Sequence, residues 1–248
     1  MNKWKNRAAC EAAARLLPFY REYPYRGPVS FFKVDPRGAY SPAEPFFYNR
    51  VPKAANSTIT ATLRSYSTYR RAFSRDDNPK DHFLRPSYLG SRNFRRLRDE
   101  AFKFTVVRDP YSRTLSAFQS KILRHRPQEK AFRAWFKSDA TPSFLDFCHY
   151  LDDGHLWADA HWAPQSDIML LPVETFDFIG RFENLNADLG HIVRTIFGDQ
   201  IDFRIETSNI SKPTNAQEKV PEFYGPAETK IVTRLFERDF QTFGYARR

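Results

Sequence analysis

The chain has 248 residues, of which 41% are hydrophobic and 27% are charged, and these are ordinary proportions for a globular protein. Its formal net charge of +10 favours a polyanionic partner, either nucleic acid, an anionic membrane, a nucleotide or an acidic glycan, without choosing among them. Two cysteines, Cys10 and Cys148, make no disulfide framework and have no zinc-site spacing, so we expect free thiols and no bound metal.

The first 45 residues predict one helix and an extended lead-in. In residues 1–17, alanines and leucines recur at helical spacing between basic side chains. A helix packed on the domain is favoured over a peripheral amphipathic helix in contact with a membrane. Because the chain shows neither a signal peptide nor a transmembrane stretch, we expect a cytoplasmic protein. Residues 18–45 are rich in Pro and Tyr, which predicts turns.

A strand, a loop and a helix are predicted next. The apolar run at residues 45–51 is typical of a buried strand, and residues 52–58 form a loop of small and polar residues. Residues 59–69 predict a helix, with Asn56 or Ser57 as its N-cap.

Such a loop is an anion site, because free N–H groups and the positive end of the helix dipole point into it. Lys53 adds a full positive charge, and Ser57 and Thr58 add hydroxyl donors. Ala54 and Ala55 are small enough for a phosphate to approach the backbone. The Lys comes first and no glycine is present, so this is not a Walker A loop. An ordinary strand-to-helix turn is the alternative.

A second strand and helix are predicted further along the chain. After a polar segment at 76–86 and a short basic helix at 94–100, residues 102–107 predict a strand. The helix at 111–124 follows, with Asp109 as N-cap and Pro110 at its first position.

Arg108 lies at the carboxyl end of that strand, where ligands bind in open α/β sheets. Its planar guanidinium can bind a phosphate, and Ser116 in the following helix can add a hydroxyl. The alternative is a structural ion pair with Asp109, which we favour for Arg113 but not for Arg108.

The rest of the chain continues the alternation of strands and helices. We expect a helical stretch at 126–159, short strands at 168–171 and 176–179, an amphipathic helix at 184–197, a polar loop at 207–224 and a final helix at 228–240. This order predicts an α/β fold with a mostly parallel sheet. Without repeats or a low-complexity tract, residues 1–248 are predicted to form one domain.

Several of these stretches together resemble one family. Residues 47–58 (FYNRVPKAANST) resemble the 5′-phosphosulfate loop of the Golgi-type carbohydrate sulfotransferases, and residues 106–118 (VVRDPYSRTLSAF) resemble their 3′-phosphate motif. Residues 160–165, 177–185 and 239–245 resemble further segments of the group that includes chondroitin 4-O-, HNK-1 and heparan sulfate 2-O-sulfotransferases.

The resemblance implies a P-loop-like three-layer fold, in which helices flank a mostly parallel central sheet, with a family-like core at 46–245 after a lead-in at 1–45. It also implies a PAPS-dependent O-sulfotransferase. Such an enzyme moves a sulfuryl group from 3′-phosphoadenosine 5′-phosphosulfate (PAPS) to an acceptor hydroxyl, here of a carbohydrate or glycolipid, and leaves adenosine 3′,5′-bisphosphate. No metal is required.

Roles for individual residues also follow from the resemblance. Lys53 would hold the 5′-phosphosulfate, and the backbone of residues 54–58 would surround the same group. Arg108 and Ser116 would bind the 3′-phosphate. A late loop closes over the nucleotide in this family. Residues 208–219 are its counterpart here, and Ser211 or Lys212 would contact the nucleotide.

A histidine is expected to accept the proton of the acceptor hydroxyl. We choose His82, because the heparan sulfate 2-O- and chondroitin 4-O-enzymes carry a His in a similar context between the two cofactor motifs. A histidine in a surface loop is the alternative for this residue. His161 is the second candidate base, although its place beside Trp162 is also typical of core packing.

The chain departs from the Golgi members, because it shows neither their membrane anchor and stem nor their cysteine pairs. A cytosolic or bacterial form of the family fits better, and a surface polysaccharide, a glycolipid or a small hydroxylated metabolite is then a compatible acceptor. A P-loop-type kinase acting on a small molecule, a non-catalytic nucleic-acid-binding protein and an inactive relative that only binds PAPS are the competing hypotheses.

Overall fold

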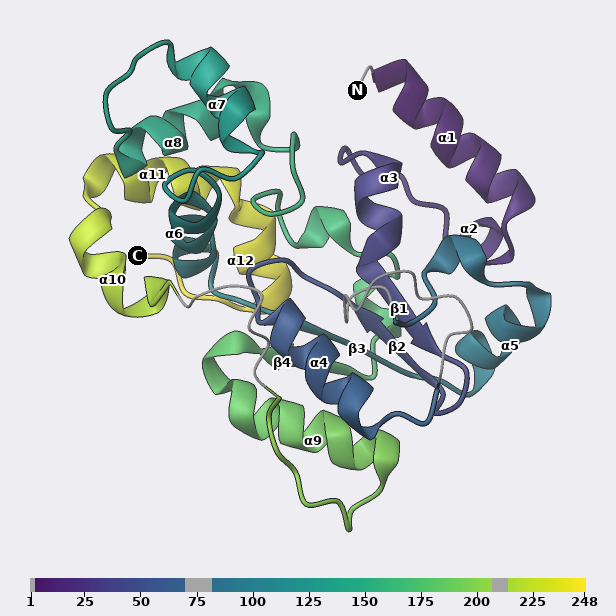
Figure 1. The fold of residues 1–248 in the computed structure, drawn as a ribbon. Coiled ribbons are helices and arrows are strands. Elements are labelled where there is room, and N and C mark those ends of the chain that lie inside the picture. Colours follow the sequence, from purple (N-terminus) through teal and green to yellow (C-terminus); the bar gives the residue numbers. More distant parts are fainter. Residues whose placement is uncertain (1–2, 70–81, 207–213) are drawn as a thin grey trace. The chain divides into compact units, whose positions relative to one another are not determined.

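The computed structural model describes residues 3–69, 82–206 and 214–248. The chain divides into two compact units, which are described separately (Figure 1). Unit 1 holds residues 1–107 and 168–211, and unit 2 holds residues 108–167 and 212–248. That the whole chain forms one domain therefore stays a prediction.

Unit 1 is built on a four-stranded sheet with the order β1-β2-β3-β4. The strands are β1 (Gly38–Ser41), β2 (Phe46–Asn49), β3 (Phe102–Val107) and β4 (Phe178–Arg181). The pair β1 and β2 is antiparallel and the other two pairs are parallel. The predicted α/β class, the mostly parallel sheet and the strands at 45–51 and 102–107 are confirmed. Strand β1, inside the expected lead-in, was not predicted.

Helices cover both faces of this sheet. Helices α4 (Asn56–Tyr66) and α9 (Leu185–Phe197) share one hydrophobic cluster with Phe46. Because neighbouring side chains of a strand point to opposite faces, Phe47 faces the other side, where its ring packs 5.7 Å from that of Phe19 in α2 (Pro18–Glu22). The unit therefore has the three layers that the resemblance implied.

The remaining helices of unit 1 are α1 (Lys3–Leu16), α3 (Phe31–Val34) and α5 (Ser91–Asp99). The predicted helices at 1–17, 94–100 and 184–197 are confirmed. Asn6 ties α1 to the rest of the unit, since its side chain accepts from the Phe31 N–H at 2.7 Å and donates to the Val29 carbonyl at 3.3 Å. No helix in the described ranges has the length and apolar character needed to span a bilayer.

The expected strand at 168–171 is wrong, and Asn49 is the physical reason. Its side chain donates to the Ile168 carbonyl at 3.3 Å and accepts from the Leu170 N–H at 2.7 Å. A side chain thus takes the backbone partners that a neighbouring strand would have supplied, and the segment turns instead of extending.

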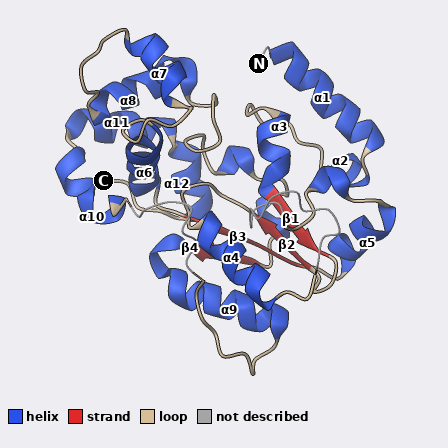
Figure 2. Cartoon of the chain, viewed as in Figure 1, coloured by secondary structure: helices blue, strands red, loops and turns tan. Residues whose placement is uncertain are grey.

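Unit 2 is helical, and all strands of the described residues lie in unit 1 (Figure 2). Its helices are α6 (Pro110–Lys121), α7 (Glu129–Phe136), α8 (Phe144–Tyr150), α10 (Ala216–Phe223), α11 (Pro226–Leu235) and α12 (Glu237–Phe243). They enclose a largely aromatic core that includes Phe118, Phe147 and Phe240.

Three predictions for unit 2 need correction. The helical stretch at 126–159 is broken, because Lys137 has φ +52° at the end of α7 and Ser143 begins α8 with a capping box. The final helix at 228–240 is two helices, separated at Phe236. The polar loop at 207–224 contains α10, whose Ala216 and Val220 are buried.

Candidate functional site

The loop between β2 and α4 carries the first predicted anion site. Lys53 has φ +72° and Ala55 has φ +54°, so a left-handed residue stands on each side of Ala54. Backbone that alternates in hand turns successive N–H groups to one side, which forms a concave anion site. The loop is thus shaped for an anion by its backbone, without any glycine.

The N-cap of α4 is Ala55, so the prediction of Asn56 or Ser57 was wrong. Alanine has no side-chain acceptor for the first N–H groups of the helix, which remain directed out of its end. Ser57 and Thr58 lie in this first turn and are half-buried. The turn thus presents backbone donors together with two hydroxyl groups.

Hydrogen bonds at the end of β2 fix the backbone from which the loop starts. The Thr105 hydroxyl donates to the Asn49 carbonyl at 2.9 Å, which adds a side-chain bond between β2 and β3. Arg50 then donates its N–H to the Arg37 carbonyl at 2.7 Å. Lys53 therefore projects from a segment whose preceding residues are fixed by hydrogen bonds.

Arg108 follows the last residue of β3 and is only 4% exposed. The Gln165 side chain accepts from the Arg108 N–H at 2.9 Å and donates to the Arg108 carbonyl at 2.8 Å. The Arg108 Nε donates to the Ser112 Oγ at 2.9 Å. Both the backbone and the guanidinium of this residue are thus held in place.

Helix α6 carries the partner hydroxyl. Ser112 and Ser116 are four residues apart, so they lie on one face of the helix. Since Ser112 binds the Arg108 guanidinium, Ser116 lies one turn further along the side of α6 that Arg108 approaches. The Ser116 Oγ is 3.0 Å from the Thr214 Oγ1. The structure therefore places Arg108 and Ser116 on the same side of α6 in unit 2, with Ser116 one helical turn beyond Ser112.

Asp109 is the predicted N-cap of α6, and this is confirmed. Its carboxylate accepts from the Tyr111 N–H at 3.4 Å and the Ser112 N–H at 3.1 Å. Arg113, for which an ion pair with Asp109 was favoured, is fully buried and donates to the carbonyls of Ala163 at 2.8 Å and Ala160 at 3.2 Å. Arg113 thus fixes the chain just before Gln165.

The two candidate bases lie in different units. His82 belongs to unit 1 and is 7% exposed, so it is buried and not a histidine of a surface loop. Its ring packs edge-on against those of Tyr69 at 5.7 Å and Phe83 at 4.8 Å. His161 belongs to unit 2, and its Nδ1 is 2.5 Å from the Asp159 carboxylate. Each histidine is therefore held by neighbours.

Some predicted and unpredicted features complete the site. Ser211 and Lys212 lie outside the described residues. Gln165 and Ser112 were missed, and the only signal for Gln165 was that residues 160–165 resemble a family segment. In the described part of the chain, no three His, Cys, Asp or Glu side chains are grouped as metal ligands, and the absence of a metal stays a prediction.

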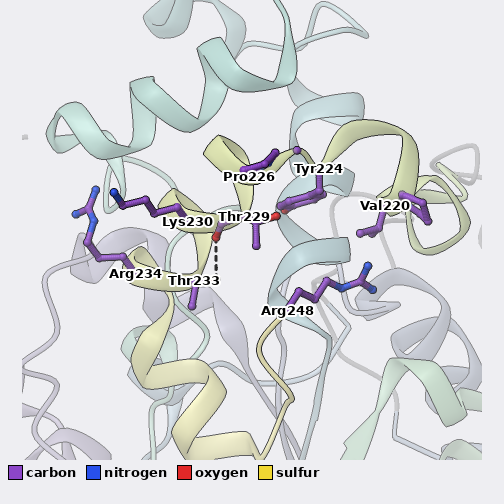
Figure 3. Close-up of a pocket in the computed structure, with 10 residues that line it drawn as sticks. Val220, Tyr224, Pro226, Thr229, Lys230, Thr233, Arg234 and Arg248 are labelled. Carbon is purple, nitrogen blue, oxygen red and sulfur yellow. Dashed lines mark hydrogen bonds between the residues drawn. The ribbon is translucent and has the colours of Figure 1, made fainter.

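Unit 2 also has a pocket of about 810 Å³ that was not predicted (Figure 3). Its lining combines basic, hydroxyl and apolar side chains and contains no acidic residue. Arg234 pairs with Asp152 at 2.7 Å, and the Arg248 guanidinium lies 5.5 Å from the centre of the Tyr111 ring. The lining residues are Val220, Pro221, Tyr224, Gly225, Pro226, Thr229, Lys230, Thr233, Arg234 and Arg248.

Comparison with known proteins places these motifs in context. The model of a family described as the sulfotransferase family matches residues 37–246. Carbohydrate sulfotransferase 10 of Xenopus laevis is 27% identical over 198 residues, which cover 68% of this chain and 54% of the relative. The protein of the same name from Gallus gallus is 27% identical over 203 residues, which cover 68% of this chain and 53% of the relative.

Carbohydrate sulfotransferase 12 of Xenopus laevis is 28% identical over 171 residues, which cover 58% of this chain and 40% of the relative. The chain thus spans about half the length of the curated relatives named first. No solved structure matches it.

Proposed function

Since this chain belongs to the sulfotransferase family, we propose that it transfers a sulfuryl group from PAPS to a hydroxyl group of a carbohydrate. The observation that carries the proposal is the pair of anion motifs, each built as phosphate recognition requires. One is the left-handed loop at Lys53. The other is Arg108, which is held by Ser112 of α6, with Ser116 one turn further along that helix. PAPS supplies the activated sulfuryl group and a 3′-phosphate for the second motif.

The Lys53 loop is proposed to bind the 5′-phosphosulfate. Backbone N–H groups at the start of α4 and the helix dipole stabilise an anion there without any rearrangement. During transfer, the acceptor oxygen forms a bond to sulfur while the bond from sulfur to the phosphate oxygen breaks. Lys53 then neutralises the charge that remains on the departing phosphate. Donors fixed before the reaction in this way are the main source of transition-state stabilisation.

Arg108 and Ser116 are proposed to bind the 3′-phosphate. A guanidinium presents two parallel N–H donors to a phosphate, and a serine hydroxyl adds a third. The Arg108 bond to Ser112 fixes the plane of the guanidinium before the ligand arrives. These contacts with the 3′-phosphate fix the position of the nucleotide, so that its sulfuryl group stays in line with the acceptor oxygen.

A histidine is proposed to take the proton of the acceptor hydroxyl as the new bond forms. His82 is our first choice, since it shares unit 1 with the Lys53 loop and is buried against two aromatic rings. His161, with its Nδ1 on Asp159, is the alternative. A carboxylate on one ring nitrogen orients the other as a base, so the alternative is also chemically sound.

The acceptor is proposed to be a carbohydrate that carries acidic groups. Support comes from the names of the relatives, carbohydrate sulfotransferases 10 and 12, and from the unit 2 pocket. A volume of about 810 Å³ is of the size that binds small ligands, and an aromatic ring beside basic side chains suits an anionic sugar.

Calorimetric titration tests the nucleotide site. Without metal, adenosine 3′,5′-bisphosphate should bind with a micromolar dissociation constant, and Lys53→Ala and Arg108→Ala should each abolish measurable binding. Arg98→Ala, which removes an exposed guanidinium from α5, is the control and should bind normally. No binding of the bisphosphate, or a preference for ATP with magnesium, would replace this proposal with the kinase hypothesis. Full binding of the bisphosphate in both site variants would overturn the assignment of Lys53 and Arg108 to its site.

A further inference from the structure

A buried chain of hydrogen bonds in unit 2 runs from Asp239 of α12 to the backbone of Arg108. One oxygen of the Asp239 carboxylate accepts from the Gln165 N–H at 2.7 Å, and the other accepts from the Ser166 N–H at 2.8 Å. The Gln165 side chain then bonds the N–H and the carbonyl of Arg108 at 2.9 and 2.8 Å. Helix α12 is thereby linked to a residue more than 120 positions earlier in the chain.

The chemistry of each link is specific. A primary amide offers one acceptor and one donor, which match the two polar groups of a single backbone residue. A carboxylate offers only acceptors, which match two successive N–H groups. Because Gln165 and Asp239 are fully buried, water cannot replace these bonds in the native state. A substitution that removes one of these hydrogen-bonding groups therefore leaves its partner buried without a hydrogen bond.

The segment between these links is fixed at its other end too. Arg113 is fully buried and donates to the carbonyls of Ala160 and Ala163, a few residues before Gln165. Burial raises the pKa of the Asp239 carboxyl above its usual value, and the positive charge of Arg113 offsets only part of that rise. Gln165 thus stands on a short stretch that is held from both sides.

We propose that Gln165 and Asp239 are positioning residues that make the protein select nucleotides with a 3′-phosphate. The inference rests on the proposed function, in which Arg108 binds that phosphate. Gln165 fixes the Arg108 backbone and Ser112 fixes its Nε, so the side chain is held at both ends. Torsional freedom that is lost before binding need not be lost during binding, and the affinity for the 3′-phosphate rises accordingly.

The test compares two ligands that differ only in the 3′-phosphate, adenosine 3′,5′-bisphosphate and adenosine 5′-monophosphate. Their affinities are measured by calorimetry for the wild type, Gln165→Glu and Asp239→Asn. Both substitutions keep the shape of the side chain. Gln165→Glu removes the donor to the Arg108 carbonyl, and Asp239→Asn removes one of the two acceptors for the N–H groups of Gln165 and Ser166. We expect the ratio of the two affinities to fall about tenfold in each variant, as the loss of one hydrogen bond implies, while the affinity for the monophosphate stays as in the wild type.

Asp167→Asn is the matched control. Asp167 lies on the same segment but bonds Trp157 and Arg238, so its substitution should leave the ratio unchanged. Asp239→Asn leaves Gln165 intact, which provides a second route should Gln165→Glu fold poorly, and near-ultraviolet circular dichroism verifies folding of each variant.

The outcomes separate the inference from the proposed function. A wild type that does not prefer the bisphosphate would remove the proposed function itself. A wild type that prefers it, with folded variants that keep the same ratio, would overturn the inference alone and make the buried chain purely structural. An equal loss of affinity for the bisphosphate and the monophosphate would likewise overturn the inference, because residues that position Arg108 should affect only the binding of the 3′-phosphate.

Discussion

At the scale of single residues, the choice of base is the sharpest question. His82 is buried between aromatic rings, whereas His161 is tied to a carboxylate. We predict that His82→Ala lowers turnover about 100-fold or more, as expected for a lost general base, and changes bisphosphate affinity less than twofold. The measurement is the rate of sulfation of a uronic-acid-bearing oligosaccharide beside calorimetric binding of the bisphosphate.

His161→Ala is the companion variant for this experiment. The reverse pattern, with turnover lost in His161→Ala and kept in His82→Ala, would transfer the role to the pair of His161 and Asp159. Loss of bisphosphate binding in His82→Ala would instead mean that this histidine maintains the structure around the Lys53 loop.

Single residues also show what the sequence could reveal about the site. Lys53, Arg108 and Asp109 could be proposed from the sequence because their roles depend on neighbours a few positions away, and the N-cap role of Asp109 is confirmed. Gln165 and Asp239 were not found, since each acts on a partner more than 50 positions distant. A glutamine in a loop has no local pattern that distinguishes a buried backbone ligand from a surface residue.

At the scale of elements, Glu44 joins the turn after β1 to the end of α4. Its carboxylate accepts from the hydroxyls of Ser41 at 3.1 Å and Ser67 at 2.6 Å and from the Thr68 N–H at 2.7 Å. Burial raises the pKa of Glu44, but these hydrogen bonds outweigh it and bring the pKa below its usual value. The charged form is thus the one that stabilises the fold.

The sign of the pH dependence follows. A carboxylate with a lowered pKa stabilises the fold above its unfolded pKa of about 4.3, and this contribution is lost as the pH falls through the folded value. We predict that Glu44→Gln lowers the free energy of unfolding by about 1–2 kcal/mol at neutral pH, and that the difference narrows below about pH 4. Urea unfolding across this pH range measures both effects.

Glu100→Gln is the control, because Glu100 is exposed and pairs only with Arg96 one turn away in the contacts of the described chain. Its effect should stay below about 0.5 kcal/mol at neutral pH. A Glu44→Gln difference that persists unchanged into acid would show that the geometry of the side chain, and not its charge, provides the stability.

Elements were predictable where their signals are local. Strand β3 has the sequence FKFTVV, in which aromatic and β-branched residues predominate, and α6 starts at Pro110 with Asp109 as its N-cap, which are strong starting signals. Strand β1 has the sequence GAYS, which lacks any such pattern, and it is extended because it pairs with β2. The break after α7 depends on a left-handed lysine, a conformation that no residue type at that position indicates.

At the scale of the whole molecule, the net charge of +10 and the unit 2 pocket concern the same ligand class. A diffuse positive field attracts any polyanion, whereas a pocket selects by local contacts. The two effects can be separated, because salt screens long-range attraction and shortens the Debye length from about 10 Å at 0.1 M to about 3 Å at 1 M.

We therefore predict that a uronic-acid-bearing oligosaccharide binds more weakly as salt rises, and that Lys230→Glu weakens its binding about tenfold at low salt. Lys130→Glu on α7 is the control, since it changes the net charge by the same amount outside the pocket. Equilibrium binding of a labelled oligosaccharide measures both. Equal losses in the two variants would assign the attraction to the overall field, whereas a loss confined to Lys230→Glu places the sugar in the pocket.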